Sequence, residues 1–175
     1  MKKILIAVIA LITTVSAYSQ KFVFVDMDYM LNKMPSYNNA QKELDKIAEG
    51  WQKEVQDKMK KVDDMYKQFQ AEQVLMTEPM KQQKMKEIED KEKDVKDFQK
   101  AKFGTNGELF KKRQELIKPI QDKIYNEVQK YALAKALDFI FDRSSGPSML
   151  YANEKLNKSD EILQSLGITP KPEGK

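Results

Sequence analysis

The side chains that most often carry chemistry in proteins are unevenly represented in this sequence. It contains no Cys and no His, but 27 Asp and Glu residues and 31 Lys and Arg residues. Without His the chain lacks the usual general base and the usual zinc ligand, and without Cys it has no disulfide framework. Carboxylates alone can catalyse reactions, but no pair is set apart by its spacing. We therefore expect no catalytic residues, no metal site and no cofactor, and a protein that is not an enzyme.

Apolar side chains cluster around the sequence Met76-Thr77-Glu78-Pro79. Methionine is flexible and polarisable, so such a cluster suits a surface that accepts many apolar partners. The alternative is that these side chains only close the end of a helical hairpin. The candidate binding residues are Val74, Leu75, Met76, Met80 and Met85.

Cationic side chains are densest a little further along the chain. They could attract acidic partners or anionic lipid headgroups. The alternative is a solvated helix face, because Glu108 and Glu115 flank the group. The basic patch consists of Lys100, Lys102, Lys111, Lys112 and Arg113.

Both clusters belong to a long charged segment, from about Tyr37 to Ala136, in which apolar residues recur every seven positions. The first series is Ala48, Val55, Val62, Phe69 and Met76, and Ile88, Val95 and Leu109 continue it after the break. A narrow heptad seam can pack against one helix while its other faces stay in water. Thr77 can cap the returning helix and Pro79 fits its first turn. The pattern predicts one antiparallel helical hairpin, a coiled-coil arm with its tip at 76–79.

The two seams stay in step if the hairpin closes about residues 78 and 79, because Phe69 then faces Ile88. The same register sets Gly50 and Trp51 opposite the segment that contains Gly104 and Gly107. Glycine inside a helix costs up to about 1 kcal/mol. Either the indole of Trp51 needs small neighbours, or Gly50, Gly104 and Gly107 form a hinge; both readings remain open.

Short apolar runs flank the hairpin and predict a small β-sheet body. We expect strands at 21–26, 137–142 and 149–152, a short helix at 26–34 that Pro35 ends, Ser36 as the N-cap of the long helix, and a last helix from Ser159 to Gly167. Three short strands bury too little alone, so oligomerisation should complete the body. The predicted fold class is α+β, mostly α, with the hairpin inserted in the sheet. The expected parts are 1–19, a signal peptide; 20–36 with 118–168, the body; 37–117, the arm; and 169–175, a disordered tail.

The first residues are typical of a secretory signal peptide. Lys2 and Lys3 precede an apolar run of about nine residues, too short to span a bilayer, and small residues allow cleavage after residue 17 or 19. Cleavage would remove two of the positive charges that give the net charge of +4. We therefore expect an exported soluble protein, and export together with near-neutral charge counts against a nucleic-acid partner.

The order of signal, strand, charged hairpin and closing strands resembles the Skp/OmpH family of periplasmic chaperones for outer-membrane proteins. The resemblance rests on Lys21–Met27, on 103–109, on 111–120, on Leu137–Asp142 and on 160–168. It implies a periplasmic homotrimer whose three arms enclose a cavity that holds unfolded outer-membrane proteins without ATP. Some family members are thought to bind lipopolysaccharide, a further partner to which no residue is assigned.

A structural coiled-coil spacer or adaptor protein of the cell envelope is the alternative function. A spacer needs a defined docking surface for fixed partners, whereas an arm inserted in an oligomeric sheet leaves its tip free. Charge alone does not separate these two functions.

Overall fold

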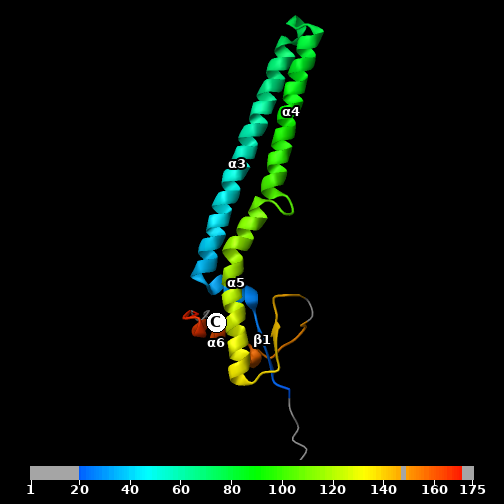
Figure 1. The fold of residues 1–175 in the computed structure, drawn as a ribbon. Helices are drawn as coiled ribbons and strands as arrows, with labels where there is room; N and C mark the ends of the chain where they lie inside the picture. The colour runs from blue at the N-terminus through cyan, green and yellow to red at the C-terminus, as the bar shows by residue number, and fades with distance from the viewer. Residues whose placement is uncertain (1–19, 147–148, 171–175) are drawn as a thin grey trace, which may run out of the picture. The chain divides into compact units, whose positions relative to one another are not determined.

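The computed structural model describes residues 20–146 and 149–170 (Figure 1). The predicted signal peptide lies outside these residues, as does most of the predicted tail. The described residues divide into two units, 31–124 and a second unit in which 20–30 comes together with 125–146 and 149–170. Within the described residues, no helix is long and apolar enough to cross a membrane.

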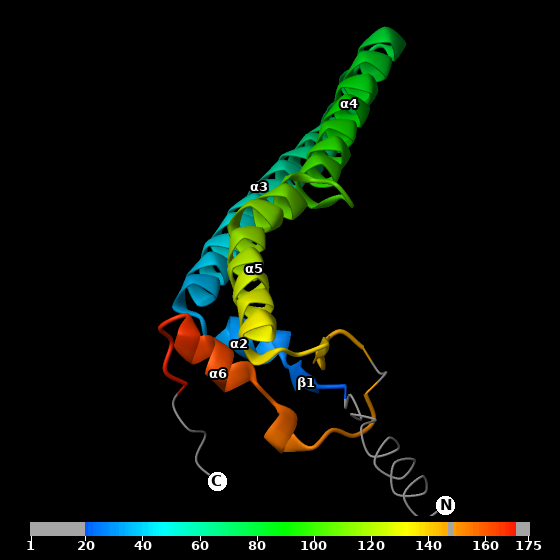
Figure 2. The same cartoon turned by 60° about the horizontal axis from the view of Figure 1, so that its bottom comes forward.

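The first of these units, 31–124, contains the antiparallel hairpin that the heptads predict. Helix α3 (Pro35–Glu72) and a short 3-10 turn, η1 (Gln73–Leu75), lead to the tip, and α4 (Glu78–Phe103) returns beside α3 (Figures 1 and 2). Helix α5 (Glu108–Lys135) continues the return after a break. The buried seam includes Leu44, Val55, Phe69, Ile88 and Val95.

Contacts between α3 and α4 agree with the predicted register. Phe69 and Ile88 line the same small cavity near the tip. Further down, Lys58 lies 5.0 Å from the ring centroid of Phe98, and Trp51 meets Phe103 edge-on with ring centroids 6.3 Å apart. The apolar spacing therefore predicted both the pairing and its alignment.

The start of α3 differs from the prediction. Met34, not Ser36, is the N-cap residue, and Pro35 is the first residue of the helix. A proline is well tolerated there because the amide hydrogen that it lacks would have no partner in the first turn. At the tip, Thr77 is the N-cap of α4, as predicted, although its side chain makes no capping hydrogen bond.

The second unit contains a sheet of two parallel strands. β1 (Phe22–Val25) pairs with β2 (Phe139–Asp142), with Phe22 beside Phe139 and Val25 beside Asp142. The predicted third strand at 149–152 is wrong. The other edge of β1 is instead met at Phe24 by Asn157 in a single bridge, with the Lys158 amide donating to the Phe24 carbonyl at 2.9 Å.

Polar groups hold the end of β1 in place. Asp26 accepts a hydrogen bond from the Tyr29 amide at the start of α2 (Met27–Lys33). The hydroxyl of Ser159, the buried first residue of α6 (Ser159–Ser165), accepts from the Asp26 amide at 2.8 Å. Helix α6 begins where the sequence predicts, and Gly167, at φ 77°, follows its end. The Ser159 bond joins segments 133 positions apart in the sequence, and Ile162 and Leu163 of α6 are fully buried.

Candidate functional site

The apolar cluster at the end of the hairpin separates into two groups. Met76 is half-buried and lines the small cavity of Phe69 and Ile88, and Met85 is also half-buried. In contrast, Val74 and Leu75 are 82% and 88% exposed, and Met80 is 51% exposed. Closing the hairpin therefore accounts for Met76, while three side chains project into solvent. We call Val74, Leu75 and Met80 the tip patch.

The predicted basic patch also separates into two groups. Lys102 lies 2.7 Å from Glu108, and its ammonium sits over the rings of Trp51 at 4.7 Å and Phe98 at 5.4 Å. Lys112 lies 2.7 Å from Glu115, and its hydrogen bond to that carboxylate raises the pKa of Lys112. Lys102 therefore joins the two sides of the hairpin through Trp51, whereas Lys112 forms an exposed pair within α5.

The remaining basic side chains are exposed. Lys100 and Lys111 line one shallow hollow beside the break between α4 and α5. Arg113 lies exposed in the first turns of α5. Lys112 is exposed as well, but its ammonium is paired with Glu115; the exposed cations outside these ion pairs are Lys100, Lys111 and Arg113.

The break between α4 and α5 is a tight turn at residues 104–107, which stands out from the side of the hairpin in Figures 1 and 2. The Gly107 amide donates to the Gly104 carbonyl at 2.8 Å. A Cβ at Gly104 would lie 2.4 Å from the Lys100 carbonyl oxygen, and one at Gly107 would lie 2.8 Å from that of Lys102. Both positions therefore require glycine for close backbone approach.

Gly50 has a different environment, although the register sets it at the same level. A Cβ built there would meet nothing within 4 Å. The packing of Trp51 therefore does not require a small residue at position 50. The structure places a helix break at Gly104 and Gly107 but leaves α3 continuous through Gly50.

An apolar surface on the two-stranded sheet was not among the predicted site residues. Phe22, Phe139 and Phe141 are about half exposed, at 52%, 53% and 49%, and the Phe141 ring contacts both of the others. We call these three residues the sheet face. The sequence signal for the sheet face is the run of apolar residues at consecutive positions of β1, which indicates a strand covered on both faces. Within one chain, however, the Phe22 side chain stays half exposed.

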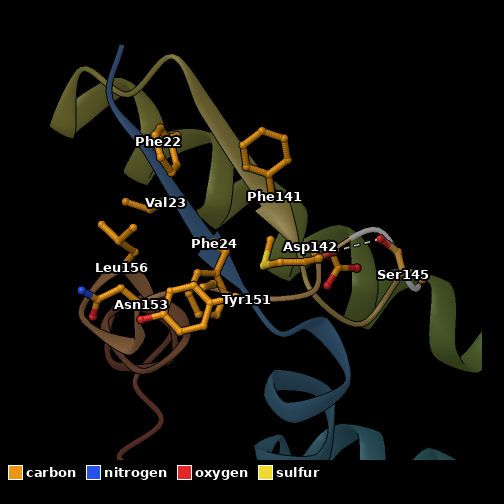
Figure 3. A pocket seen from close by; sticks show the side chains of 12 residues that line it. Phe22, Val23, Phe24, Phe141, Asp142, Ser145, Tyr151, Asn153 and Leu156 are labelled. Atoms are coloured by element: carbon orange, nitrogen blue, oxygen red, sulfur yellow. Dashed lines mark hydrogen bonds between the residues drawn. The ribbon is translucent and has the colours of Figure 1, made fainter. Parts of the chain in front are cut away.

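A cavity of about 530 Å³ lies beside the sheet face (Figure 3). Side chains of β1 and β2 line it together with the segment that was wrongly predicted as a strand. Within that segment Leu150 is 97% exposed and Tyr151 is 86% exposed. The lining residues labelled in Figure 3 are Phe22, Val23, Phe24, Phe141, Asp142, Ser145, Tyr151, Asn153 and Leu156.

Charged side chains near the sheet form ion pairs. The Arg143 guanidinium lies 3.0 Å from Asp26 and 2.9 Å from Glu154, and the Asp26 hydrogen bond is the main reason why the pKa of Arg143 is raised. The Arg143 guanidinium also lies 5.4 Å from the centroid of the Phe24 ring. Arg143, which directly follows β2, therefore connects the end of β1 at Asp26 with Glu154, further along the chain.

A second polar group connects α5 with α6. The Tyr131 hydroxyl donates to Glu161 at 2.5 Å, and Lys158 donates to the same carboxylate at 2.6 Å. Burial, helped by the Glu161 hydrogen bond, raises the pKa of Tyr131 to about 12. The Lys158 hydrogen bond, followed by that of Tyr131, lowers the pKa of Glu161. The Tyr131 hydroxyl and the Glu161 carboxylate thus connect the two helices. Among the described residues, no cluster of three or more acidic side chains could hold a metal ion.

Comparisons with known proteins agree with this architecture. The model of a family described as outer membrane protein (OmpH-like) matches residues 21–166. An uncharacterized protein of Aquifex aeolicus (strain VF5) is 32% identical over 160 residues, which cover 91% of this chain and 93% of that protein. An OmpH-like protein of Caulobacter crescentus CB15, solved as a candidate outer membrane chaperone, has the same fold, with a TM-score of 0.69 at 12% identity over 89% of this chain and 90% of that one. The chain thus belongs to the Skp/OmpH family.

Proposed function

We propose that this protein is an ATP-independent holdase chaperone that binds unfolded outer-membrane β-barrel proteins and prevents their aggregation. The proposal rests on one observation. The apolar seam of the hairpin is buried between its own helices, yet three apolar side chains at its end, Val74, Leu75 and Met80, remain exposed. Membership of the OmpH-like family supports a chaperone role, as does the shared fold with the candidate outer membrane chaperone of C. crescentus.

Three copies of the chain form the working chaperone in this proposal. The sheet face is apolar, continuous and half exposed, and burying it against further copies would stabilise the body by about 25 cal/mol for each Å² removed from water. The hairpins of the three copies then act as arms around a common cavity, where a client chain makes many weak contacts. Holding aggregation-prone strands apart requires no chemistry and no nucleotide.

The exposed cations Lys100, Lys111 and Arg113 would add electrostatic attraction for acidic clients or for anionic lipid and lipopolysaccharide surfaces. Their exposure supports this proposal, whereas Lys102 and Lys112 are engaged in ion pairs. Attraction of this kind predicts that client capture weakens as the ionic strength rises beyond about 0.15 M.

We also propose that the protein works in the periplasm after cleavage of a signal peptide at residue 17 or 19. The charged start followed by a short apolar run supports export. Sequencing the amino terminus of protein recovered from the periplasmic fraction would identify the cleaved bond.

One experiment tests both the assembly and the function. The native mass of the mature chain is measured first, and a urea-unfolded outer-membrane barrel protein is then diluted into nucleotide-free buffer containing the chaperone in substoichiometric amounts relative to client. We expect a trimer and suppressed light scattering. A trimer without suppression would contradict the holdase function alone, and a monomer without suppression would contradict the assembly as well.

A further inference from the structure

The turn at residues 104–107 contains the one Asn-Gly sequence of the chain, Asn106-Gly107. Asparagine followed by glycine is chemically labile because glycine has no Cβ to hinder attack by its amide nitrogen on the neighbouring side chain. We propose that Asn106 is a site of spontaneous deamidation and isomerisation, which the closed turn shields and an opened turn exposes.

The reaction needs only water. The Gly107 nitrogen attacks the Cγ of Asn106, a C–N bond forms, and the side-chain nitrogen leaves as ammonia, giving a five-membered succinimide. Water then opens the ring at either carbonyl. One product is an ordinary aspartyl residue, and the other is an isoaspartyl residue whose backbone runs through the side chain. No electrons are transferred, and the net change is an amide plus water converted into a carboxylate and ammonium.

The closed turn opposes the first step. The amide hydrogen of Gly107 is donated to the Gly104 carbonyl at 2.8 Å, so the nitrogen is held away from the attack and retains its proton. Gly107 is itself buried, and its Cα is closely surrounded, because an added Cβ would lie within 2.9 Å of the carbonyl oxygens of Ala101 and Lys102. Asn106, in contrast, is exposed. Attack therefore requires the turn to open.

The products would alter the turn in two ways. Asn106 lines the same hollow as Lys100 and Lys111, so a new carboxylate there reduces the positive potential of these two lysines. The isoaspartyl product also lengthens the backbone by one methylene directly before Gly107, whose own Cα is closely surrounded by backbone carbonyls. Deamidation would thus keep open a turn that is otherwise closed, and its extent would record how long the turn has spent open.

The test compares the folded full-length chain with the same chain unfolded in urea, both incubated at mildly alkaline pH. Peptide mapping then follows the mass increase of about one dalton in the peptide 103–111. We expect modification at Asn106 in the unfolded chain, and a rate lower by about tenfold or more in the folded chain, because a reaction that requires local opening is limited by the open population. Trp51→Ala, which removes the ring contact to Phe103 beside the turn, should accelerate the folded-state reaction.

Internal and engineered controls accompany this measurement. Asn38, Asn126 and Asn157 are followed by residues other than glycine and should stay unmodified on the same timescale, while Asn106→Gln should abolish the product in 103–111. Equal rates in the folded and unfolded chains would overturn the shielding. An unmodified Asn106 in the unfolded chain would overturn the site itself.

Discussion

Gly50, Gly104 and Gly107 occupy one level of the hairpin, but their surroundings differ at the scale of single atoms. Gly104 and Gly107 have backbone carbonyl oxygens within 2.8 Å of the position that a Cβ would take, whereas Gly50 has no neighbour within 4 Å. The register derived from the heptads brought the three together. Spacing cannot reveal whether a glycine is required for close approach, because that depends on the path of the neighbouring backbone.

Alanine substitutions should separate these glycines. Gly50→Ala places a better helix former in the interior of α3 without a contact, so the free energy of unfolding should rise by about 0.5–1 kcal/mol. Gly104→Ala forces a Cβ against the Lys100 carbonyl and should lower it by about 1–3 kcal/mol. Urea titration followed by circular dichroism measures both. Equal effects of the two variants would contradict the structure of the turn.

Tyr131 should make stability depend on alkaline pH. Its pKa is raised from 10.0 to about 12 in the folded chain. The contribution of Tyr131 to the free energy of unfolding is therefore fully present below about pH 10. It is lost as the pH rises from about 10 to about 12, because the unfolded chain gives up this proton first. The unfolding midpoint of the wild type should therefore fall more steeply across this interval than that of Tyr131→Phe. Tyr125→Phe, at an exposed tyrosine, is the matched control and should behave as wild type.

The tip patch provides a residue-level test of client binding. Leu75→Ser and Met80→Ser together remove apolar surface that the fold does not bury, so the affinity for an unfolded barrel protein should fall several-fold while helicity stays the same. Met59→Ser is a suitable control, since Met59 and Met80 are both 51% exposed. Fluorescence titration with a labelled client measures the affinity. Unchanged binding by the double variant, or an equal loss with Met59→Ser, would exclude a special role of the tip.

At the scale of elements, local periodicity predicted far more than local composition. The seven-residue spacing predicted the two helices of the hairpin, their antiparallel direction and the contact region shared by Phe69 and Ile88. The segment 149–152 has strand-forming residues but pairs with no strand, because Asn157 takes the adjoining edge of β1. A strand depends on a partner that its own residues do not identify, whereas a heptad seam carries its pairing in its spacing.

The turn between α4 and α5 should behave as the weak element of the hairpin. A single backbone bond, from Gly107 to Gly104, spans it, while α3 runs unbroken beside it. We therefore expect amide hydrogen exchange in the hairpin to peak at residues 103–107, with strong protection around buried Ile88 and Val55. Uniform protection along the hairpin would exclude the hinge.

At the scale of the whole molecule, the sheet face is the surface through which we propose that copies of the chain associate. Phe139→Glu places a charge on this surface and should convert the proposed trimer into monomers, because burying an unpaired carboxylate costs several kcal/mol. Phe110→Glu is the control at a comparable aromatic of the hairpin, 44% exposed against 53% for Phe139. Native mass spectrometry distinguishes the two. A wild-type mass retained by Phe139→Glu would show that copies associate elsewhere.

The parallel pairing of β1 with β2 also governs the order in which the chain folds. The Lys21 amide bonds to Asp138 across 117 positions of the sequence, whereas the hairpin is made of contacts between neighbouring helices. Local contacts form quickly, and distant parallel strands must wait until the loop between them has closed. The hairpin is thus expected to condense first and to shorten the loop that the sheet still has to close. During that interval the apolar β1 strand remains unpaired. The folding chain therefore exposes an aggregation-prone strand of its own, the same kind of strand that it is proposed to shield in its clients.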